Sequence, residues 1–203
     1  AVLFLILQTI GQASLDWRNG SFGAALAFLS GLLHAVFLVF TLPLCERLFM
    51  VATDIRLSEL GNLNLKLIRE LIVKAPGTYN HSVAVGTLCE GAAKAVGTNP
   101  LFLRIAALYH DIGKALQPEY FVENQKKGNP HDGIRSRESV QIIKNHITYG
   151  IAAARKEHLP HSIVDLIPQH HGTKLMRFFY EKAKEEATAS RGEVQEELYR
   201  YGG

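Results

Sequence analysis

The spacing of charged residues divides the chain at Leu44. No charged side chain occurs in residues 1–10 or 21–44, whereas beyond Leu44 charges recur every few residues. About 20 apolar residues span the ~30 Å hydrocarbon core of a bilayer, so residues 21–44 are long enough to cross one. A buried core helix is the alternative, but a polar face is nearly absent. The pattern therefore predicts a full transmembrane helix over 21–44.

Residues 1–10 are also apolar, but they are too short to cross a bilayer alone. They are interpreted as the C-terminal half of another membrane helix, joined to the next helix through the polar turn 11–20. A signal peptide is the other interpretation, but the segment has no initiator Met and no basic n-region. We therefore expect residues 1–44 to be membrane segments and the chain to be a fragment of a larger membrane protein.

Helical periodicity dominates the rest of the chain. Leucines at helical spacing between positions 57 and 71 predict a helical linker over 45–75, which the Ala75-Pro76-Gly77 sequence ends. Further helices are expected at about 80–96, 101–113, 136–157 and 160–171, with a loop over 114–132 and a charged helical tail after residue 172. Because alternating β patterns and internal repeats are missing from the sequence, the prediction is an all-α fold with a helical domain over 76–203.

Charge and cysteine content indicate the class of partner and the cellular compartment of the chain. The net charge of +3 does not demand a nucleic-acid polymer as partner. Basic residues follow the predicted membrane helix, whereas the turn before it holds only Asp16 and Arg18. By the positive-inside rule the C-terminal domain is expected in the cytoplasm. Two isolated cysteines suggest neither a disulfide framework nor a zinc ribbon, which fits a reducing compartment.

The histidines carry the candidate chemistry, since eight of the nine lie between positions 81 and 171. Six candidate side chains each lie on or at the end of a predicted helix: His81, His110, Asp111, His146, His170 and His171. Several helices can direct such side chains to one interior point, as in the metal sites of helical bundles. Imidazole and carboxylate ligands together suit Fe, Mn, Zn or Co. The sequence therefore predicts a metal site, with Lys114 one turn beyond His110.

Each of these residues also has a simpler interpretation. A lone histidine on a helix is more often a surface or core residue than a ligand, and we keep this interpretation for His131, His158 and His161. It is less suited to Asp111, because burying a carboxylate without a metal or a cation is costly. Lys114 could instead complement the dipole of the helix that precedes it.

Two sets of motifs resemble a known family. ALYHDIGK resembles the signature of the HD superfamily of phosphohydrolases. The wider string of APGTYNHS, YHDIGK, YFVENQ, NPHD, NH and HHGT resembles the PgpH-type seven-transmembrane HD phosphodiesterases of bacteria. These hydrolyse cyclic di-AMP to the linear dinucleotide pApA. The resemblance covers nearly the whole chain, because TLPLCERLF is similar to the exit from that family's last membrane helix.

The resemblance implies a site with two divalent transition-metal ions, most simply Mn or Fe. His81, His110 and Asp111 would bind the first ion, and Asp111 would bridge to a second ion held by His146, His170 and His171. The family's final ligand is an aspartate on a later helix, which would lie past Gly203, so the domain is expected to lack its C-terminal end.

The same resemblance assigns the groups that face the substrate. Asp111 and Lys114 would be catalytic, and Lys114 would face the phosphate while a water activated by the ions attacks phosphorus. The sequence offers no Ser-His or Cys-His nucleophile. Asn124, Asn129 and His131 are candidates to line the substrate pocket, although Asn also builds turns for its own sake.

Alternatives remain open for substrate and class. Another nucleotide could replace cyclic di-AMP, although GTKLMRFFY lacks the Gly-Tyr-Pro element expected of enzymes that cleave cyclic di-GMP. A non-catalytic receptor module that senses a nucleotide is the second class. The preferred expectation is a multi-pass protein of the cell membrane with its HD domain in the cytoplasm and with a cyclic dinucleotide and the lipid bilayer as partners. The leucine stripe between 57 and 71 could serve a homodimer or, more commonly, core packing.

Overall fold

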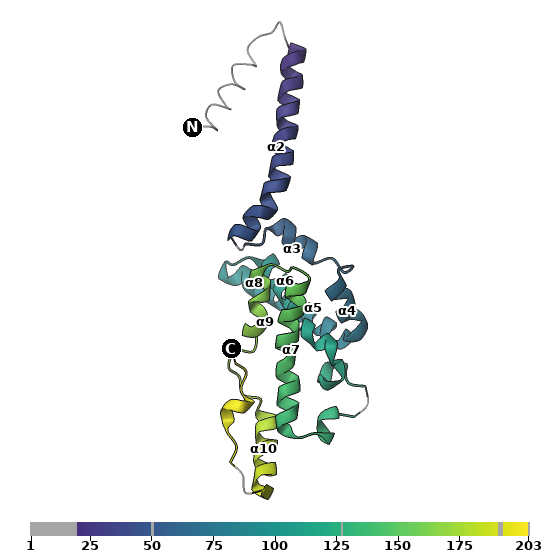
Figure 1. Cartoon of the computed structure of the whole chain (residues 1–203), viewed down its shortest axis with the longest axis vertical. Helices are drawn as coiled ribbons and strands as arrows, with labels where there is room; N and C mark the ends of the chain where they lie inside the picture. Colours follow the sequence, from purple (N-terminus) through teal and green to yellow (C-terminus); the bar gives the residue numbers. More distant parts are fainter. Residues whose placement is uncertain (1–19, 50, 127, 191–192, 203) are drawn as a thin grey trace. The chain divides into compact units, whose positions relative to one another are not determined.

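The structure is a computed structural model that describes residues 20–49, 51–126, 128–190 and 193–202 (Figure 1). It divides into two compact units, Ala1–Phe49 and Met50–Gly203, which are considered separately. The expected helix within residues 1–10 lies outside the described residues.

The described part of the first unit is one helix, α2 (Gly20–Phe49). Its stretch Gly23–Glu46 has a mean hydropathy of 2.2, and none of its most apolar window is buried within the structure. Large side chains point outward, such as Phe28, which is 77% exposed, and Phe40, which is 76% exposed. The helix is long and apolar enough to cross a membrane, consistent with the transmembrane helix predicted over 21–44.

The expected linker over 45–75 is divided into α3 (Asp54–Leu60) and α4 (Lys66–Lys74). A turn separates these helices, because the Asn62 side chain accepts a hydrogen bond from the Asn64 N–H at 2.9 Å and so competes with the helical ladder. Both helices belong to the second unit, whose core buries most of the leucine stripe. Most of the leucine stripe between 57 and 71 therefore packs in the core of the second unit.

Two longer helices follow and pack along each other, α5 (Pro76–Val96) and α6 (Pro100–Tyr109). Each has proline in its first turn, where the missing N–H costs nothing. The Asn99 side chain caps α6 by accepting a hydrogen bond from the Phe102 N–H at 2.9 Å. Helix α6 ends at Tyr109 instead of continuing to the expected residue 113, and this early end shapes the candidate site.

The expected loop over 114–132 contains short 3₁₀ turns: η2 (Ile112–Leu116), η3 (Pro118–Tyr120), η4 (Val122–Asn124) and η5 (Pro130–Gly133). The remaining elements are α7 (Ser136–Lys156), α8 (His161–Val164), α9 (Leu166–Gln169), α10 (Arg177–Ser190) and η6 (Glu196–Tyr199). The single helix expected over 160–171 is thus two short ones. Pro168 has no N–H to donate to the Val164 carbonyl, so the ladder breaks between them.

The described residues form no β-strand, and the only β pairing among them is an isolated antiparallel bridge between Leu175 and Arg200. In this bridge the Tyr201 N–H donates to the Lys174 carbonyl at 3.1 Å, which brings the last described residues back to the segment after α9. The all-α prediction is confirmed.

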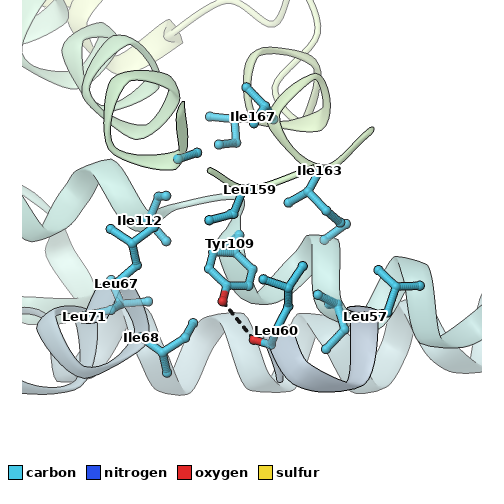
Figure 2. Close-up of a cluster of buried hydrophobic side chains, with 14 of the residues drawn as sticks. Leu57, Leu60, Leu67, Ile68, Leu71, Tyr109, Ile112, Leu159, Ile163 and Ile167 are labelled. Carbon is cyan, nitrogen blue, oxygen red and sulfur yellow. Dashed lines mark hydrogen bonds between the residues drawn. The ribbon is translucent and has the colours of Figure 1, made fainter. Parts of the chain in front are cut away.

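The main core of the second unit joins α3 and α4 to α6, η2 and the α8–α9 segment. Figure 2 shows its side chains, with Tyr109 at the centre. The Tyr109 hydroxyl donates a hydrogen bond of 2.8 Å to the Leu60 carbonyl, and burial raises the pKa of this phenol to about 12. The hydroxyl therefore remains a donor at all physiological pH values and ties the end of α3 to α6.

Replacing Tyr109 by phenylalanine is expected to lower the free energy of unfolding by about 1–2 kcal/mol, because the buried Leu60 carbonyl loses its donor. Urea unfolding followed by circular dichroism measures the effect. Tyr149→Phe is the matched control, since Tyr149 is 38% exposed. Equal stability of the two variants would contradict a stabilising role for the hydrogen bond.

Candidate metal centre

A buried carboxylate lies at the centre of the site. Asp111 follows the end of α6, and its side chain is 2% exposed. Its Oδ2 lies 3.0 Å from His110 Nε2 and 2.8 Å from Lys114 Nζ. Its Oδ1 lies 3.3 Å from His146 Nε2 and 3.5 Å from His170 Nε2. Oδ1 therefore faces the imidazoles of two separate elements, whereas Oδ2 faces the His110 imidazole and the Lys114 ammonium.

The chain brings these groups together from distant positions. His81 comes from α5, His146 from α7, and His170 and His171 follow α9. A close contact between η2 and α7 is essential, because a Cβ on Gly113 would lie 1.8 Å from the His146 carbonyl oxygen. Only glycine allows the backbone after Asp111 to approach α7 this closely.

Several of the histidine rings are oriented in the same way, by the carbonyl three residues earlier. His110 Nδ1 lies 2.6 Å from the Ala107 oxygen, and His170 Nδ1 lies 2.6 Å from the Ile167 oxygen. His146 Nδ1 contacts the Ile143 oxygen in the same manner. A carbonyl can only accept, so these contacts assign the proton to Nδ1 and leave the lone pair on Nε2. This is how proteins commonly orient histidine ligands of metals.

The atoms that face the centre have no conventional partner. Asp111 Oδ1 and the Nε2 atoms of His146, His170 and His171 are buried without a hydrogen bond among the described residues. Buried polar atoms without partners are rare in proteins and call for an explanation. The ligand atoms of Asp111, His146, His170 and His171 lie within 4.8 Å of one another. Those of His81, His110 and Asp111 form a second such group.

A pair of metal ions fits this arrangement. Asp111 belongs to both groups, so its two oxygens can serve two ions, and imidazoles with a carboxylate suit divalent transition metals. The structure therefore brings together the six side chains that the sequence predicted as ligands. Their role as ligands stays a prediction.

The pKa values of His146 and His171 favour the same chemistry, whereas at His110 burial is outweighed by the hydrogen bond and charge of Asp111, which raise the pKa. Burial lowers the pKa of His146 to about 4, and burial together with the neighbouring His170 and His146 lowers that of His171 to about 3. Both imidazoles are thus neutral at pH 7, which is the form that binds metal. Burial alone would raise the pKa of Asp111, but the His110 and His170 imidazoles and the Lys114 charge outweigh it and hold the pKa well below its usual range. Asp111 is therefore a carboxylate anion.

The residues predicted to face the substrate are placed differently from one another. Lys114 lies directly at Asp111, whereas the Asn124 carboxamide contacts the backbone N–H and hydroxyl of Thr78. His131 is 4% exposed, with Nε2 3.0 Å from the Tyr120 carbonyl oxygen and its ring edge-on to Phe179. The contacts of Asn124 and His131 thus show loop-holding roles, and direct binding of substrate by either stays a prediction.

Asn129 builds its own turn, because its side-chain oxygen accepts hydrogen bonds from the His131 N–H at 3.1 Å and from the Gln125 amide at 3.2 Å. Two further residues of the site were not singled out from the sequence. Glu123 binds Lys114, and the Tyr201 ring stacks on His171 with centroids 4.1 Å apart. Glu123 lies within the YFVENQ motif, but its role was not apparent from the sequence, since each of the two residues acts through a contact between distant parts of the chain.

Comparison with known proteins identifies relatives of this chain. The model of the HD domain family matches residues 78–199. The chain is 41% identical over 203 residues to the cyclic-di-AMP phosphodiesterase PgpH of Listeria monocytogenes and 42% identical over 203 residues to that of Bacillus subtilis. It is also similar to the crystal structure of the L. monocytogenes PgpH HD domain in complex with cyclic-di-AMP, with a TM-score of 0.65 and 45% identity.

These matches differ in how much they cover. The curated PgpH relatives match all of this chain, but the chain spans 28% of their length. The match to the solved HD domain covers 70% of this chain and 65% of that one. The likeness therefore extends over both described units in sequence and over the larger part of the chain in structure.

Proposed function

The chain belongs to the HD domain family, and from this premise we propose that it is a metal-dependent phosphodiesterase that hydrolyses cyclic di-AMP to pApA. The observation that carries the proposal is the convergence of histidines from separate elements on the two oxygens of Asp111, with the Lys114 ammonium beside them. Such a site is suited to an anionic phosphoester, since it offers both ligands for cations and a fixed positive charge.

Two divalent ions, Mn or Fe, are proposed as the cofactors. His81, His110 and Asp111 would hold one, and Asp111, His146, His170 and His171 the other. When bound, the ions would supply Lewis acidity, which acidifies a water molecule and neutralises the phosphate oxygens.

The residues of the chain supply orientation and charge. Asp111 is ionised, and its two oxygens face different imidazoles. Lys114 presents an ammonium group beside them, which can bind a phosphate oxygen as negative charge develops there. In the reaction the water oxygen bonds to phosphorus, the bond from phosphorus to the 3′-oxygen breaks, and the proton passes to that oxygen. No covalent link to the protein is needed for this displacement.

The substrate is proposed from the relatives. The L. monocytogenes and B. subtilis proteins are named cyclic-di-AMP phosphodiesterases, and the similar HD domain was solved with cyclic-di-AMP. Lys114 is the proposed contact to the phosphate. Asn124 and His131 remain candidate substrate-binding residues that would act through the loop they hold, given their contacts to Thr78 and Tyr120.

The setting proposed for the enzyme is the cell membrane, in a multi-pass protein with the HD domain in the cytoplasm. Helix α2 supports the presence of a membrane segment, and the lipid bilayer would be the partner of this segment. The basic residues that follow α2, such as Arg56 and Lys74, support the cytoplasmic side by the positive-inside rule.

The test is product analysis on the full-length protein. With Mn²⁺, we expect conversion of cyclic di-AMP to pApA and a slower reaction with cyclic di-GMP. Tight binding of cyclic di-AMP without turnover, despite bound metal, would favour the receptor class. Faster hydrolysis of another nucleotide would reassign the substrate while keeping the chemistry.

Replacing Lys114 by methionine is expected to lower kcat on the order of 100-fold, because the charge that stabilises the phosphate is lost while the aliphatic stem still fills its place. Bound Mn²⁺, measured by plasma mass spectrometry, should be unchanged, since Lys114 is in neither ligand group. An equally active variant would contradict the proposed phosphate contact.

A further inference from the structure

The Lys114 ammonium is held between two carboxylates. Its Nζ lies 2.8 Å from Asp111 Oδ2 and 2.8 Å from Glu123 Oε1, and the side chain is only 12% exposed. It also lies 5.0 Å from the centroid of the Phe121 ring. A cation with so little solvent must be paired, and these contacts fix where the ammonium lies.

The two carboxylates are not equivalent partners. Both oxygens of Asp111 face imidazoles, and Asp111 belongs to both of the groups that could hold a metal ion. Glu123 belongs to neither group. When the Asp111 oxygens serve as ligands, Glu123 is therefore the anion that remains, among the described residues, to hold Lys114.

Glu123 is itself fixed by the start of α5. The Thr78 hydroxyl donates to Glu123 Oε1 at 2.9 Å, and Thr78 is fully buried. The neighbouring Asn124 accepts from the Thr78 N–H at 3.1 Å and donates to its hydroxyl at 2.8 Å. The turn η4 is thus bound to the same helix that carries His81.

The backbones of η4 and α5 are also in direct contact. A Cβ on Gly77 would lie 1.8 Å from the Glu123 carbonyl oxygen and 2.5 Å from its carbonyl carbon. A side chain at this position would push η4 away from α5. The position of the Glu123 carboxylate therefore depends on both hydrogen bonds and a backbone approach that only glycine permits.

From these contacts we infer that Glu123 is a positioning residue, which directs the Lys114 ammonium to the substrate phosphate and is set in place by Thr78, Asn124 and Gly77. The inference rests on the proposed phosphodiesterase function. The turn η4 would then influence the reaction through Lys114, although Glu123 contacts none of the reacting atoms.

A double-mutant cycle on the full-length protein tests the inference, with Mn²⁺ and cyclic di-AMP. Glu123→Gln keeps the shape of the side chain and an acceptor for Thr78 but removes the charge that holds Lys114. We expect kcat to fall roughly 10- to 100-fold with unchanged bound Mn²⁺, because a displaced catalytic group costs about this much. In a Lys114→Met background the same change should have no further effect, since residues that act as a unit are not additive.

Full additivity in this cycle would overturn the inference, because Glu123 would then act independently of Lys114. The wild-type reaction in the same assay separates the two possible failures. No pApA from the wild type would refute the proposed function, whereas wild-type turnover with an additive cycle would refute only the positioning role.

Gly77→Ala provides a second variant that removes no polar group. It should reproduce the loss in kcat and, in chelator-treated protein, increase hydrogen exchange in residues 112–126. Gly91→Ala on the same helix is the matched control, because its Cβ would meet nothing within 4 Å. A Gly77→Ala variant with wild-type kcat and exchange would overturn the inference, and if it does not fold, the Glu123→Gln cycle decides alone.

Discussion

Replacing Asp111 by asparagine is expected to lower kcat for cyclic di-AMP by a factor on the order of 1000 or more, about 4 kcal/mol of transition-state stabilisation. Asparagine fills the same volume but removes the negative charge shared by His110, His146 and His170. Because Asp111 belongs to both candidate ligand groups, a single substitution should weaken the binding of both ions. No other single residue of the described site has this property.

The measurement pairs steady-state kinetics with the metal content of the purified full-length protein. His161→Asn is the control, since this histidine is exposed and belongs to neither ligand group. It should retain wild-type activity and metal. If Asp111→Asn kept its metal and more than a tenth of the wild-type activity, Asp111 would not be the shared ligand.

The second large effect concerns stability. Gly113→Ala is expected to lower the free energy of unfolding by about 3 kcal/mol or more, because its Cβ would meet the His146 oxygen at 1.8 Å and the Gly150 nitrogen at 2.6 Å. These are backbone atoms of α7 and cannot move aside as a flexible side chain could. In a domain of this size the melting temperature should fall by roughly 6–12 °C. The separation of η2 from α7 should also displace Asp111 from His146.

Thermal unfolding followed by circular dichroism measures this loss. Gly133→Ala is the matched control, because its Cβ would meet nothing within 4 Å, and it should melt close to the wild type. If Gly113→Ala melted at the wild-type temperature, the close contact between η2 and α7 would not exist in solution.

Much of the architecture follows from local patterns. Helix α5 ends at Val96 and α7 begins at Ser136, where glycine and helical periodicity predicted these ends, whereas α5 begins at Pro76 and not at the expected residue 80. The composition boundary at Leu44 anticipated the separate apolar helix α2. The clustering of the site histidines with Asp111 was also predictable from residue type and spacing, and their role as ligands stays a prediction. The helix ends and the composition boundary depend on residues that are near one another in the sequence, so the sequence predicts them.

Most of the features that the sequence did not reveal depend on contacts between distant residues. Glu123 reaches Thr78 and Lys114 only because η4 folds back on α5. The division of the expected linker is an exception, because the asparagine turn at Asn62 is local but competes with a leucine pattern that otherwise predicts one helix. The pairing of Leu175 with Arg200, which places Tyr201 against His171, is likewise a tertiary feature.

Asp111 is proposed to join two metal ions held by separate groups of histidines. Anomalous diffraction from crystals of the full-length protein loaded with Mn²⁺ tests this proposal most directly. We expect two peaks about 3.5–4 Å apart, one beside His81 and His110, the other beside His146, His170 and His171, with Asp111 between them. A single peak, or two peaks of which only one contacts Asp111, would contradict it.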